Sequence, residues 1–182
     1  MASGIGNVEQ LVHQFGTDGL HLQQADRQGD VVIGEVGRGA ARSAGVVYSV
    51  HFGGPDICAA FGLENGYDAN YSGSAVLMAD GSARGQVNDT FAGSGAGLHA
   101  FIDCLHVAGK DAWLSGVTKH GKTPRGFDLA GFPIIFRVRD NGTSASDPYD
   151  QVSASQIGYA TPCYMEPDIR MFDYQNGQVT IN

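Results

Sequence analysis

The sequence predicts an all-β, largely antiparallel fold, either a barrel or a closed sandwich, with a short N-terminal helix. The first observation behind this is a series of roughly nine or ten short β-type runs separated by tight-turn residues. The second is the 27 glycines, which disfavour long helices and suit turns and bulges. The third is a hydrophobic fraction of 42% beside only 16% charged residues, typical of a folded chain. Since 182 residues suit one domain, we expect a single β domain, with a glycine-rich extension over 1–45 and a core over 46–182.

The segment Asn7–Phe15 is the best helix candidate, because apolar residues recur at helical spacing behind a capping asparagine. The remaining periodic runs alternate or are bounded by turn residues, as strands are. The runs predicted as strands are 20–25, 30–36, 46–52, 74–79, 84–91, 98–107, 111–118, 133–140, 150–157 and 178–181. Asp80-Gly81 and Ala108-Gly109-Lys110 are expected to close hairpins.

Two of these runs also predict which side chains share a face. In the run 46–52, Val46, Tyr48, Val50 and Phe52 share one face. In the run 133–140, alternation predicts that Ile134, Phe136 and Val138 point inward and that Arg137 and Arg139 point outward. The turn-rich stretch 53–72 between the first two core strands has little periodicity, and long connections of this kind are often functional.

Charge and hydropathy exclude several classes of partner. The formal net charge of −8 argues against DNA or RNA, because phosphate binding requires clustered lysine and arginine. No run of residues is long and apolar enough for a membrane-spanning helix. The first residues lack the basic and apolar regions of a signal peptide, so an exported protein would have lost its signal before this start.

Several blocks of sequence occur in a characteristic order. They are Tyr71-Ser-Gly-Ser, Ile102-Asp-Cys-Leu-His-Val-Ala-Gly-Lys-Asp-Ala-Trp-Leu-Ser-Gly-Val, Phe136-Arg-Val-Arg-Asp-Asn-Gly, Asp150-Gln-Val-Ser and Asn176-Gly-Gln-Val-Thr-Ile. With these blocks, residues 67–182 resemble a recurrent group of small secreted bacterial proteins of unknown function. The resemblance implies a β-rich exported domain, secreted or at the cell surface, and no particular activity.

The same resemblance implies partners for two of the three cysteines. Members of the group carry a cysteine matching Cys104 and often one matching Cys163. In an exported protein such cysteines more often pair than act as nucleophiles. Their bond would stabilise the fold by roughly 4 kcal/mol in the chain-entropy model. Cys58 would remain as a small buried hydrophobic residue.

The segment Gly116–Thr123 matches the phosphate-binding pattern G-x-x-x-x-G-K-T letter for letter. A P-loop requires a helix directly after the motif, whose first amides bind the phosphate. Here Pro124 follows at once, and no helical period appears before Pro133. We therefore interpret the motif as a strand end followed by a glycine-rich loop, and expect no nucleotide cofactor.

The loop between Asp140 and Asp150 is rich in oxygen donors, with Asp147 as its third carboxylate. Calcium requires six to eight hard oxygen ligands, and a loop of this composition can supply them. Asp140-Asn141-Gly142 is equally an ordinary turn, and the whole stretch an ordinary solvated loop. Asp140, Asp147 and Asp150 are the candidate calcium ligands, and no other cofactor is predicted.

No complete catalytic group is visible in the sequence. His99, Asp103 and His106 lie on one predicted strand, where His99 and Asp103 share a face and His106 points to the other. Catalysis would need partners from neighbouring strands, such as His51, Arg137 or Asp111. The alternative is that these are polar residues of the surface or of the barrel end.

Two functions follow as hypotheses. The first is a non-enzymatic exported protein that binds a small molecule or assembles with copies of itself. The second is a cofactor-free cyclase, isomerase or hydrolase that uses side chains in a barrel cavity. We favour the first, because no activated nucleophile or acid–base pair can be named. The uncharged C-terminal run, with Val179 and Ile181, suits strand addition between subunits.

Overall fold

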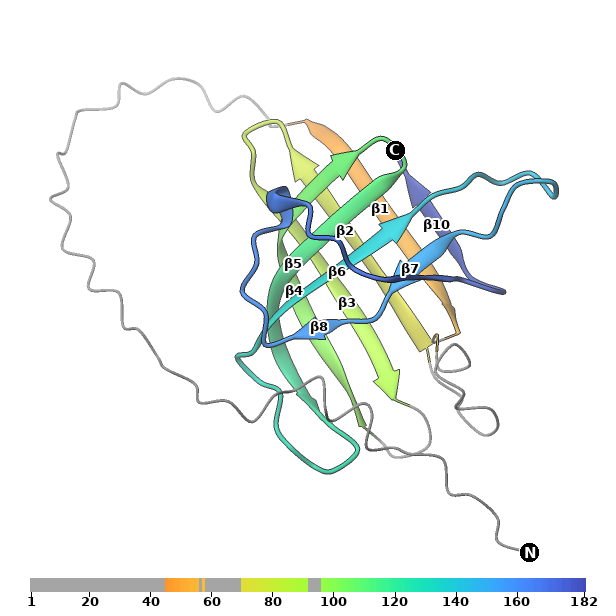
Figure 1. Ribbon diagram of the computed structural model, residues 1–182. Helices are drawn as coiled ribbons and strands as arrows, with labels where there is room; N and C mark the ends of the chain where they lie inside the picture. Colours follow the sequence, from red (N-terminus) through yellow and green to blue (C-terminus); the bar gives the residue numbers. More distant parts are fainter. Residues whose placement is uncertain (1–44, 56, 58–69, 92–95) are drawn as a thin grey trace, which may run out of the picture. The chain divides into compact units, whose positions relative to one another are not determined.

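A computed structural model describes residues 45–55, 57, 70–91 and 96–182 of the protein. In this part the chain forms one curled antiparallel sheet, a half-barrel, with no helix beyond 3₁₀ turns (Figure 1). The all-β antiparallel class is therefore confirmed. The expected helix Asn7–Phe15, the expected strands 20–25 and 30–36 and the thiol of Cys58 lie outside the described residues.

The sheet is built mainly from hairpins between consecutive strands. Its elements are β1 (Val46–Pro55), β2 (Asn70–Met78), β3 (Ala83–Phe91), β4 (Ala96–Ala108), β5 (Asp111–Lys122), β6 (Pro133–Arg139), β7 (Gln151–Ser153), β8 (Gln156–Ile157), the 3₁₀ turn η2 (Cys163–Met165), β9 (Met171–Asp173) and β10 (Gln178–Ile181). The strand order is β10-β1-β2-β3-β4-β5-β6-β7-β9, with β8 also paired to β6. The last strand thus returns beside the first.

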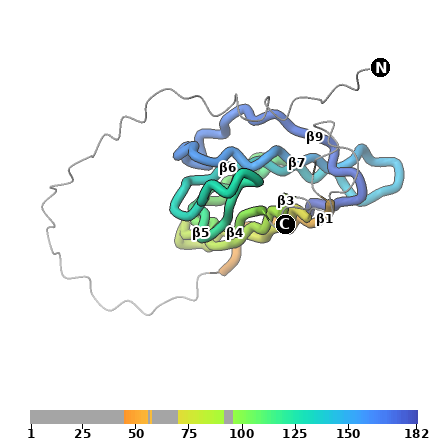
Figure 2. Tube along the Cα trace, turned by 90° about the horizontal axis from the view of Figure 1, so that it is seen from below, coloured from red at the N-terminus to blue at the C-terminus, as the bar shows by residue number. Residues whose placement is uncertain are grey.

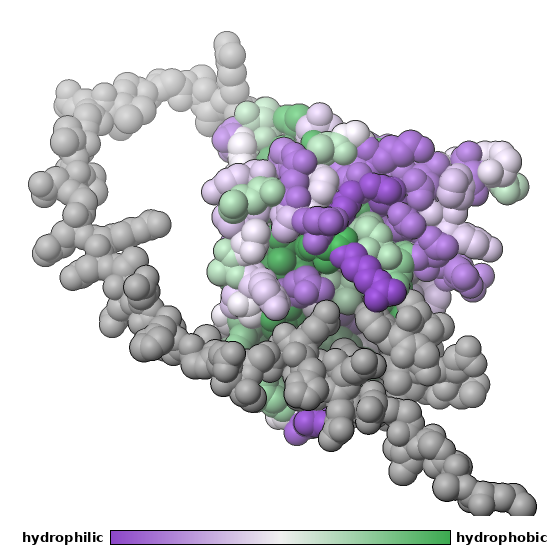
Figure 3. Space-filling view, viewed as in Figure 1, coloured by the Kyte–Doolittle hydropathy of each residue, from purple (hydrophilic) through white to green (hydrophobic). Residues whose placement is uncertain are grey.

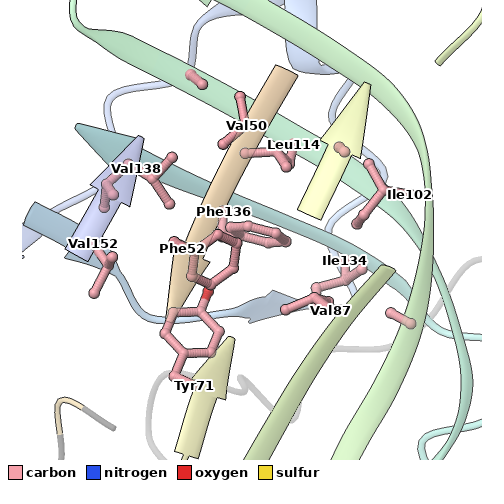
Figure 4. Packing of buried hydrophobic residues seen from close by; sticks show 14 of the residues in the cluster. Val50, Phe52, Tyr71, Val87, Ile102, Leu114, Ile134, Phe136, Val138 and Val152 are labelled. Carbon is pink, nitrogen blue, oxygen red and sulfur yellow. The ribbon is translucent and has the colours of Figure 1, made fainter. Parts of the chain in front are cut away.

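The sheet curls so that β6, β7 and β9 lie over β1, β3 and β4, and the apolar core fills the space between (Figure 2). Alternation along the strands supplies this core, as the run 133–140 predicted: Ile134, Phe136 and Val138 of β6 are fully buried. Phe136 meets Phe52 of β1 and Tyr71 of β2 edge to face, at ring-centroid distances of 5.6 and 6.0 Å (Figure 4). Aromatic rings therefore fill the middle of the half-barrel.

The prediction for β1 is confirmed only in its second half. Val50 and Phe52 belong to the core, whereas Val46 and Tyr48 are 57% and 39% exposed. The register with β2 shifts between Val46 and Tyr48, so Val46 no longer shares the face of Val50, whereas Tyr48 keeps the register of Val50. Beyond the irregularity the first residues of β1 extend past the core.

Carboxylates meet the outer edge of β10, the edge opposite β1. The backbone amides of Thr180 and Asn182 point toward β1. Since amides alternate in direction along a strand, those of Val179 and Ile181 point away from β1. Val179 donates its N–H to Asp150 Oδ2 at 2.6 Å, and Ile181 donates to Asp140 Oδ2 at 3.0 Å. At this edge aspartate oxygens accept the hydrogen bonds that the carbonyl groups of a further strand would otherwise accept.

The β4–β5 hairpin contains two β-bulges. One lies between Ile102 and Cys104 on β4, and the other leaves Lys119 of β5 unopposed, since His99 pairs with His120 and Ala100 with Thr118. A bulge inserts one residue and reverses the facing of those beyond it. Leu98, Ala100 and Ile102 point into the core by alternation, and the bulge after Ile102 makes Leu105 point there too.

The bulge corrects one expectation from the sequence. His106 was expected to face away from His99, but the extra residue at Asp103 returns His106 to the face that carries His99. We call this the outer face, since it is opposite the core. Asp103 itself is exposed at the bulge.

Residues 162–168, which we call the strap segment, cross the outer face of β4, β5 and β6. A disulfide joins Cys163 of η2 to Cys104 of β4, with a Cα–Cα distance of 5.9 Å, so the predicted pairing is confirmed. Trp113 Nε1 donates to the carbonyl oxygen of Pro167 at 3.0 Å. Hydrophilic residues surround a smaller apolar area on this side of the molecule (Figure 3). Among the described residues, no helix has the length and apolar character that crossing a membrane requires.

Candidate functional site

Polar side chains line up across the outer face away from the strap segment. The pairing registers place Gln178, Gly53, Ser72, Asn88, His99 and His120 in one row across six neighbouring strands from β10 to β5. The row ends in an open cleft of about 620 Å³. Its polar lining includes Asn88 of β3, His99 of β4, and His120 and Lys122 of β5, with Asp128 from the following loop. We call this the imidazole cleft.

His99 and His120 are the central pair of the cleft. They lie directly opposite each other on β4 and β5, with ring centroids 5.2 Å apart and ring planes inclined by 17°. His99 is half-buried, and His120 is exposed. Nδ1 of His99 lies 2.7 Å from Oδ1 of Asn88, the residue opposite it on β3. The His99 ring is thus fixed on one side by an amide and stacked on the other against a second imidazole.

The surroundings of His99 favour its neutral form. Burial lowers its pKa below the ordinary value, because the charged imidazolium loses hydration. The nearby His120 and Lys119 lower this pKa further by charge repulsion. Lys119 holds its Nζ 4.9 Å from the centroid of the Phe101 ring, and Phe101 packs edge to face on His99. At neutral pH the His99 ring therefore presents a lone pair.

Glycines bring the strands close together at the cleft. A Cβ atom on Gly121 would lie 2.5 Å from the carbonyl oxygen of Gly97, and a Cβ atom on Gly97 would lie 2.5 Å from that of Asp89. Both contacts are with backbone, which cannot move aside without displacing a strand. Because larger residues cannot occupy these positions, the cleft has backbone in its walls as well as side chains.

A buried carboxylate lies on the inner side of the same sheet end. Asp89 of β3, which also lines the cleft, is 5% exposed and accepts a hydrogen bond of 3.0 Å from the hydroxyl of Ser155. The Ser155 Oγ lies 3.4 Å from the Tyr71 hydroxyl. Polar groups from β2, β3 and the loop after β7 therefore meet where the core ends.

The structure does not gather the candidate catalytic residues His51, His99, Asp103 and Arg137 into one group. His51 lies on the outer face of β1, between Ser74 and Thr180. Asp103 is exposed at the β4 bulge. Arg137 pairs in register with Trp113, which is opposite His106 near the other end of the hairpin. Only His99 belongs to the cleft.

Arg137 belongs instead to a charged cluster beside the strap segment. Its Nε donates to Asp111 Oδ1 at 2.9 Å, and Arg139 binds both oxygens of the same carboxylate at 2.9 Å. The guanidinium of Arg137 also lies over the Trp113 ring, 4.8 Å from its centroid. Burial opposes the ionisation of Asp111, but the hydrogen bonds from Arg139 and Arg137 and their charges outweigh it, so its pKa falls below the ordinary value. This arrangement is that of a structural ion pair.

His106 also serves the strap segment. Its Nε2 lies 2.8 Å from Glu166 Oε1, and its ring is 6.1 Å from that of Trp113. Glu166 ends η2 in the left-handed backbone conformation, with φ 47°. The imidazole therefore binds the end of the 3₁₀ turn.

The P-loop pattern Gly116–Thr123 lies almost wholly within strand β5. Gly121 and Lys122 pair with β4, and the residues that follow form a loop and an isolated bridge between Lys122 and Asp128. Among the described residues, no helix follows the motif before β6 begins at Pro133. The interpretation as a strand end and loop agrees with this structure.

The three candidate calcium ligands have backbone partners. Asp140 and Asp150 each bind one amide of β10 and one amide at the start of the loop, on Gly142 and Asn141 respectively. Asp147 Oδ2 accepts the amide of Ser144 at 2.8 Å. In the parts of the chain with described positions, no three His, Cys, Asp or Glu side chains are grouped to hold a metal ion. Calcium binding here stays a prediction.

Sequence reasoning missed most of the cleft, namely His120, Asn88, Lys122 and Asp128. One signal was available for His120. If the β4–β5 hairpin turns at Gly109-Lys110, counting residues outward from the turn pairs His99 with His120. The two bulges, one on each strand, cancel over that distance, so the simple count gives the observed pair. Asn88 and Asp128 carry no comparable signal.

Comparison of the chain with models of protein families, with curated proteins and with solved structures finds no match. The resemblance to small secreted bacterial proteins therefore stays a prediction.

Proposed function

We propose that the protein is an exported, non-catalytic binding protein that takes a small polar ligand in the imidazole cleft. The observation that carries the proposal is the cleft itself, an open space of about 620 Å³ bordered by imidazole, amide, ammonium and carboxylate groups. These groups can donate and accept hydrogen bonds, and a few placed polar groups are what fix a ligand's orientation.

The packing of the core supports binding at the surface rather than inside the half-barrel. Phe52, Tyr71 and Phe136 contact one another edge to face between the two sides of the curled sheet. These rings and the aliphatic residues around them occupy the space that an internal ligand would need. The alternative of a cyclase, isomerase or hydrolase requires such a cavity, so this packing favours the binding function.

The edge of β10 favours a ligand over self-assembly by strand addition. A strand that pairs with another chain needs free amides and carbonyls along its edge. The outward amides of Val179 and Ile181 already donate to Asp150 and Asp140. A second copy would have to displace both carboxylates.

The disulfide supports the location. Cys104–Cys163 is consistent with a protein outside the cytoplasm, since such bonds form and persist in oxidising compartments. Secretion or attachment at the cell surface is the finer proposal.

The test is a titration of ¹⁵N-labelled protein with monosaccharides, amino acids and dicarboxylates, followed by amide chemical shifts. We expect saturable shifts at Asn88, His99, His120 and Lys122, with each compound recovered unchanged. The His51→Ala variant is the control, because His51 is an outer-face histidine of another row. Saturable shifts elsewhere, no shifts, or conversion of a compound into product would contradict the proposal.

A further inference from the structure

Two imidazoles lie side by side in the cleft. His99 and His120 are directly opposed across β4 and β5, with their rings stacked 5.2 Å apart. Directly opposed side chains on antiparallel strands have Cβ atoms roughly 5 Å apart, so both rings can reach one point above the sheet. Nitrogen atoms bound to one ion at about 2.0–2.1 Å lie roughly 3–4 Å apart, a spacing that rotation of the exposed His120 ring toward His99 can provide.

The hydrogen bond to Asn88 selects the tautomer that a metal ion needs. A carbonyl oxygen can only accept, so the contact of 2.7 Å places the His99 proton on Nδ1, which donates to Asn88 Oδ1. The Nε2 atom is then left with its lone pair. Histidines that bind metals commonly donate their other N–H to a carbonyl or carboxylate, which fixes the ring and raises its basicity. Asn88 occupies that supporting position.

The chemistry of the cleft decides which ion fits. The pair offers nitrogen, and Asp128 already uses Oδ1 to accept the amide of Ala130. Calcium and magnesium need several oxygen ligands, whereas imidazole suits copper, nickel and zinc. Lys122 in the lining and Lys119 nearby repel cations. The affinity for an ion must therefore come from its bonds to nitrogen rather than from charge attraction. Copper(II) forms the strongest such bonds among these ions.

We propose that His99 and His120 form a two-imidazole site for a divalent transition-metal ion, binding copper(II) most strongly. This rests on the proposed binding function and identifies a ligand class for the imidazole cleft. Two protein ligands leave coordination positions on the ion for water or for donor atoms of a small molecule in the cleft.

The test is titration of the folded full-length chain with copper(II), followed by electron paramagnetic resonance and by broadening of amide NMR signals. We expect nitrogen hyperfine structure and broadening centred on Asn88, His99 and His120. Both signatures should be lost in His99→Ala and in His120→Ala. Asn88→Ala should bind roughly 10–100-fold more weakly, because it removes only the supporting hydrogen bond.

Three variants separate this site from other histidines of the chain. His51→Ala tests an outer-face histidine of another row, and His106→Ala tests the histidine that binds Glu166. A variant with His13 and His21 both replaced by alanine tests the two histidines near the N-terminus. All three should keep the copper signature of the cleft. Copper binding that survives the loss of His99 or His120 would overturn the inference.

Copper titration and the small-molecule titration fail in distinguishable ways. If copper does not bind but a sugar, amino acid or dicarboxylate shifts the cleft amides, the metal inference is wrong and the proposed function stands. If copper binds through both histidines, the inference stands whichever small molecules bind. If inorganic phosphate saturates the cleft and copper does not, the site is one for anions, and the inference is overturned.

Discussion

The imidazole cleft and the strap segment lie on the same outer face of β4 and β5, toward opposite ends of one hairpin. Each contains a histidine with a hydrogen-bonded partner, His99 with Asn88 and His106 with Glu166. At the strap end a crossing segment covers the face and is held by a disulfide, by hydrogen bonds from Trp113 and with His106, and by the ion pair of Arg137 with Asp168. At the cleft end the pair His99 and His120 borders open space.

Residue type alone does not separate structural from ligand-binding histidines on this sheet. His106 is committed to the backbone turn that it holds through Glu166, since its Nε2 already has an acceptor. His99 has only Nδ1 engaged by a protein atom in the described hydrogen bonds, and it faces a second imidazole. The role of each histidine is decided by what covers the sheet at its end of the hairpin. Substitutions at the strap end should therefore lower stability, and substitutions at the cleft end should weaken ligand binding.

Removal of the disulfide should have the largest effect on stability. We expect Cys104→Ala with Cys163→Ala to lower the free energy of unfolding by about 2–5 kcal/mol, because the unfolded chain loses a long covalent loop. Urea denaturation without reductant measures this. Cys58→Ala, which keeps the disulfide, is the matched control. Equal midpoints for the double variant and the wild type would mean that the strap segment does not depend on its bond.

The substitution Asp111→Asn should have the next largest effect on stability. The change removes the charge that Arg137 and Arg139 both bind, while the side chain of Arg137 stays 14% exposed. We expect the free energy of unfolding to fall by about 1–3 kcal/mol, because the guanidinium groups of Arg137 and Arg139 then lack a charged acceptor at a partly buried position. Chemical denaturation at neutral pH measures it, beside Asp103→Asn as the control at an exposed carboxylate of the β4 bulge. An equal response of both variants would mean that the cluster adds nothing.

The Asp111 cluster should also appear as an acid-sensitive part of the stability. The pKa of Asp111 is lowered in the folded protein, so its contribution is present above the ordinary carboxyl pKa and is lost as pH falls through the folded value. The stability difference between wild type and Asp111→Asn should therefore shrink between about pH 5 and pH 2. Denaturation curves of both proteins across this range test it. A difference that stays constant down to the acid end would contradict the assignment.

The sequence was sufficient for features that depend on local order. Alternation predicted that Ile134, Phe136 and Val138 of β6 enter the core, although it missed the burial of Ile135 on the opposite face. Asp80-Gly81 and the glycine after Ala108 marked hairpins that the structure contains. Whether the sheet closes into a barrel could not be predicted in this way. The sequence allowed a barrel or a sandwich. In the structure the free edge of β10 binds the carboxylates of Asp140 and Asp150, which come from a loop far away in the chain.

Two further features depend on non-local geometry. The bulge at Asp103 gives no signal in the sequence, yet it determines that His99 and His106 share a face. Strand β9 has only three residues and follows an aperiodic stretch, so no alternation could reveal it. The His99–His120 pair was accessible in principle, because it follows from the turn position alone.

The smallest effect on stability is expected at the cleft. His99→Ala with His120→Ala should change the free energy of unfolding by no more than about 0.5 kcal/mol, as is usual for surface positions outside the core and its networks. The side chains lie on the outer face, and the neighbouring Leu98 and Ala100, which carry the core contacts of β4, are unchanged. Denaturation midpoints of this variant and of Cys104→Ala with Cys163→Ala, measured together, make the comparison direct. A loss above about 2 kcal/mol would place the imidazole pair with the structural residues of the strap end, since a change of that size signals a buried network.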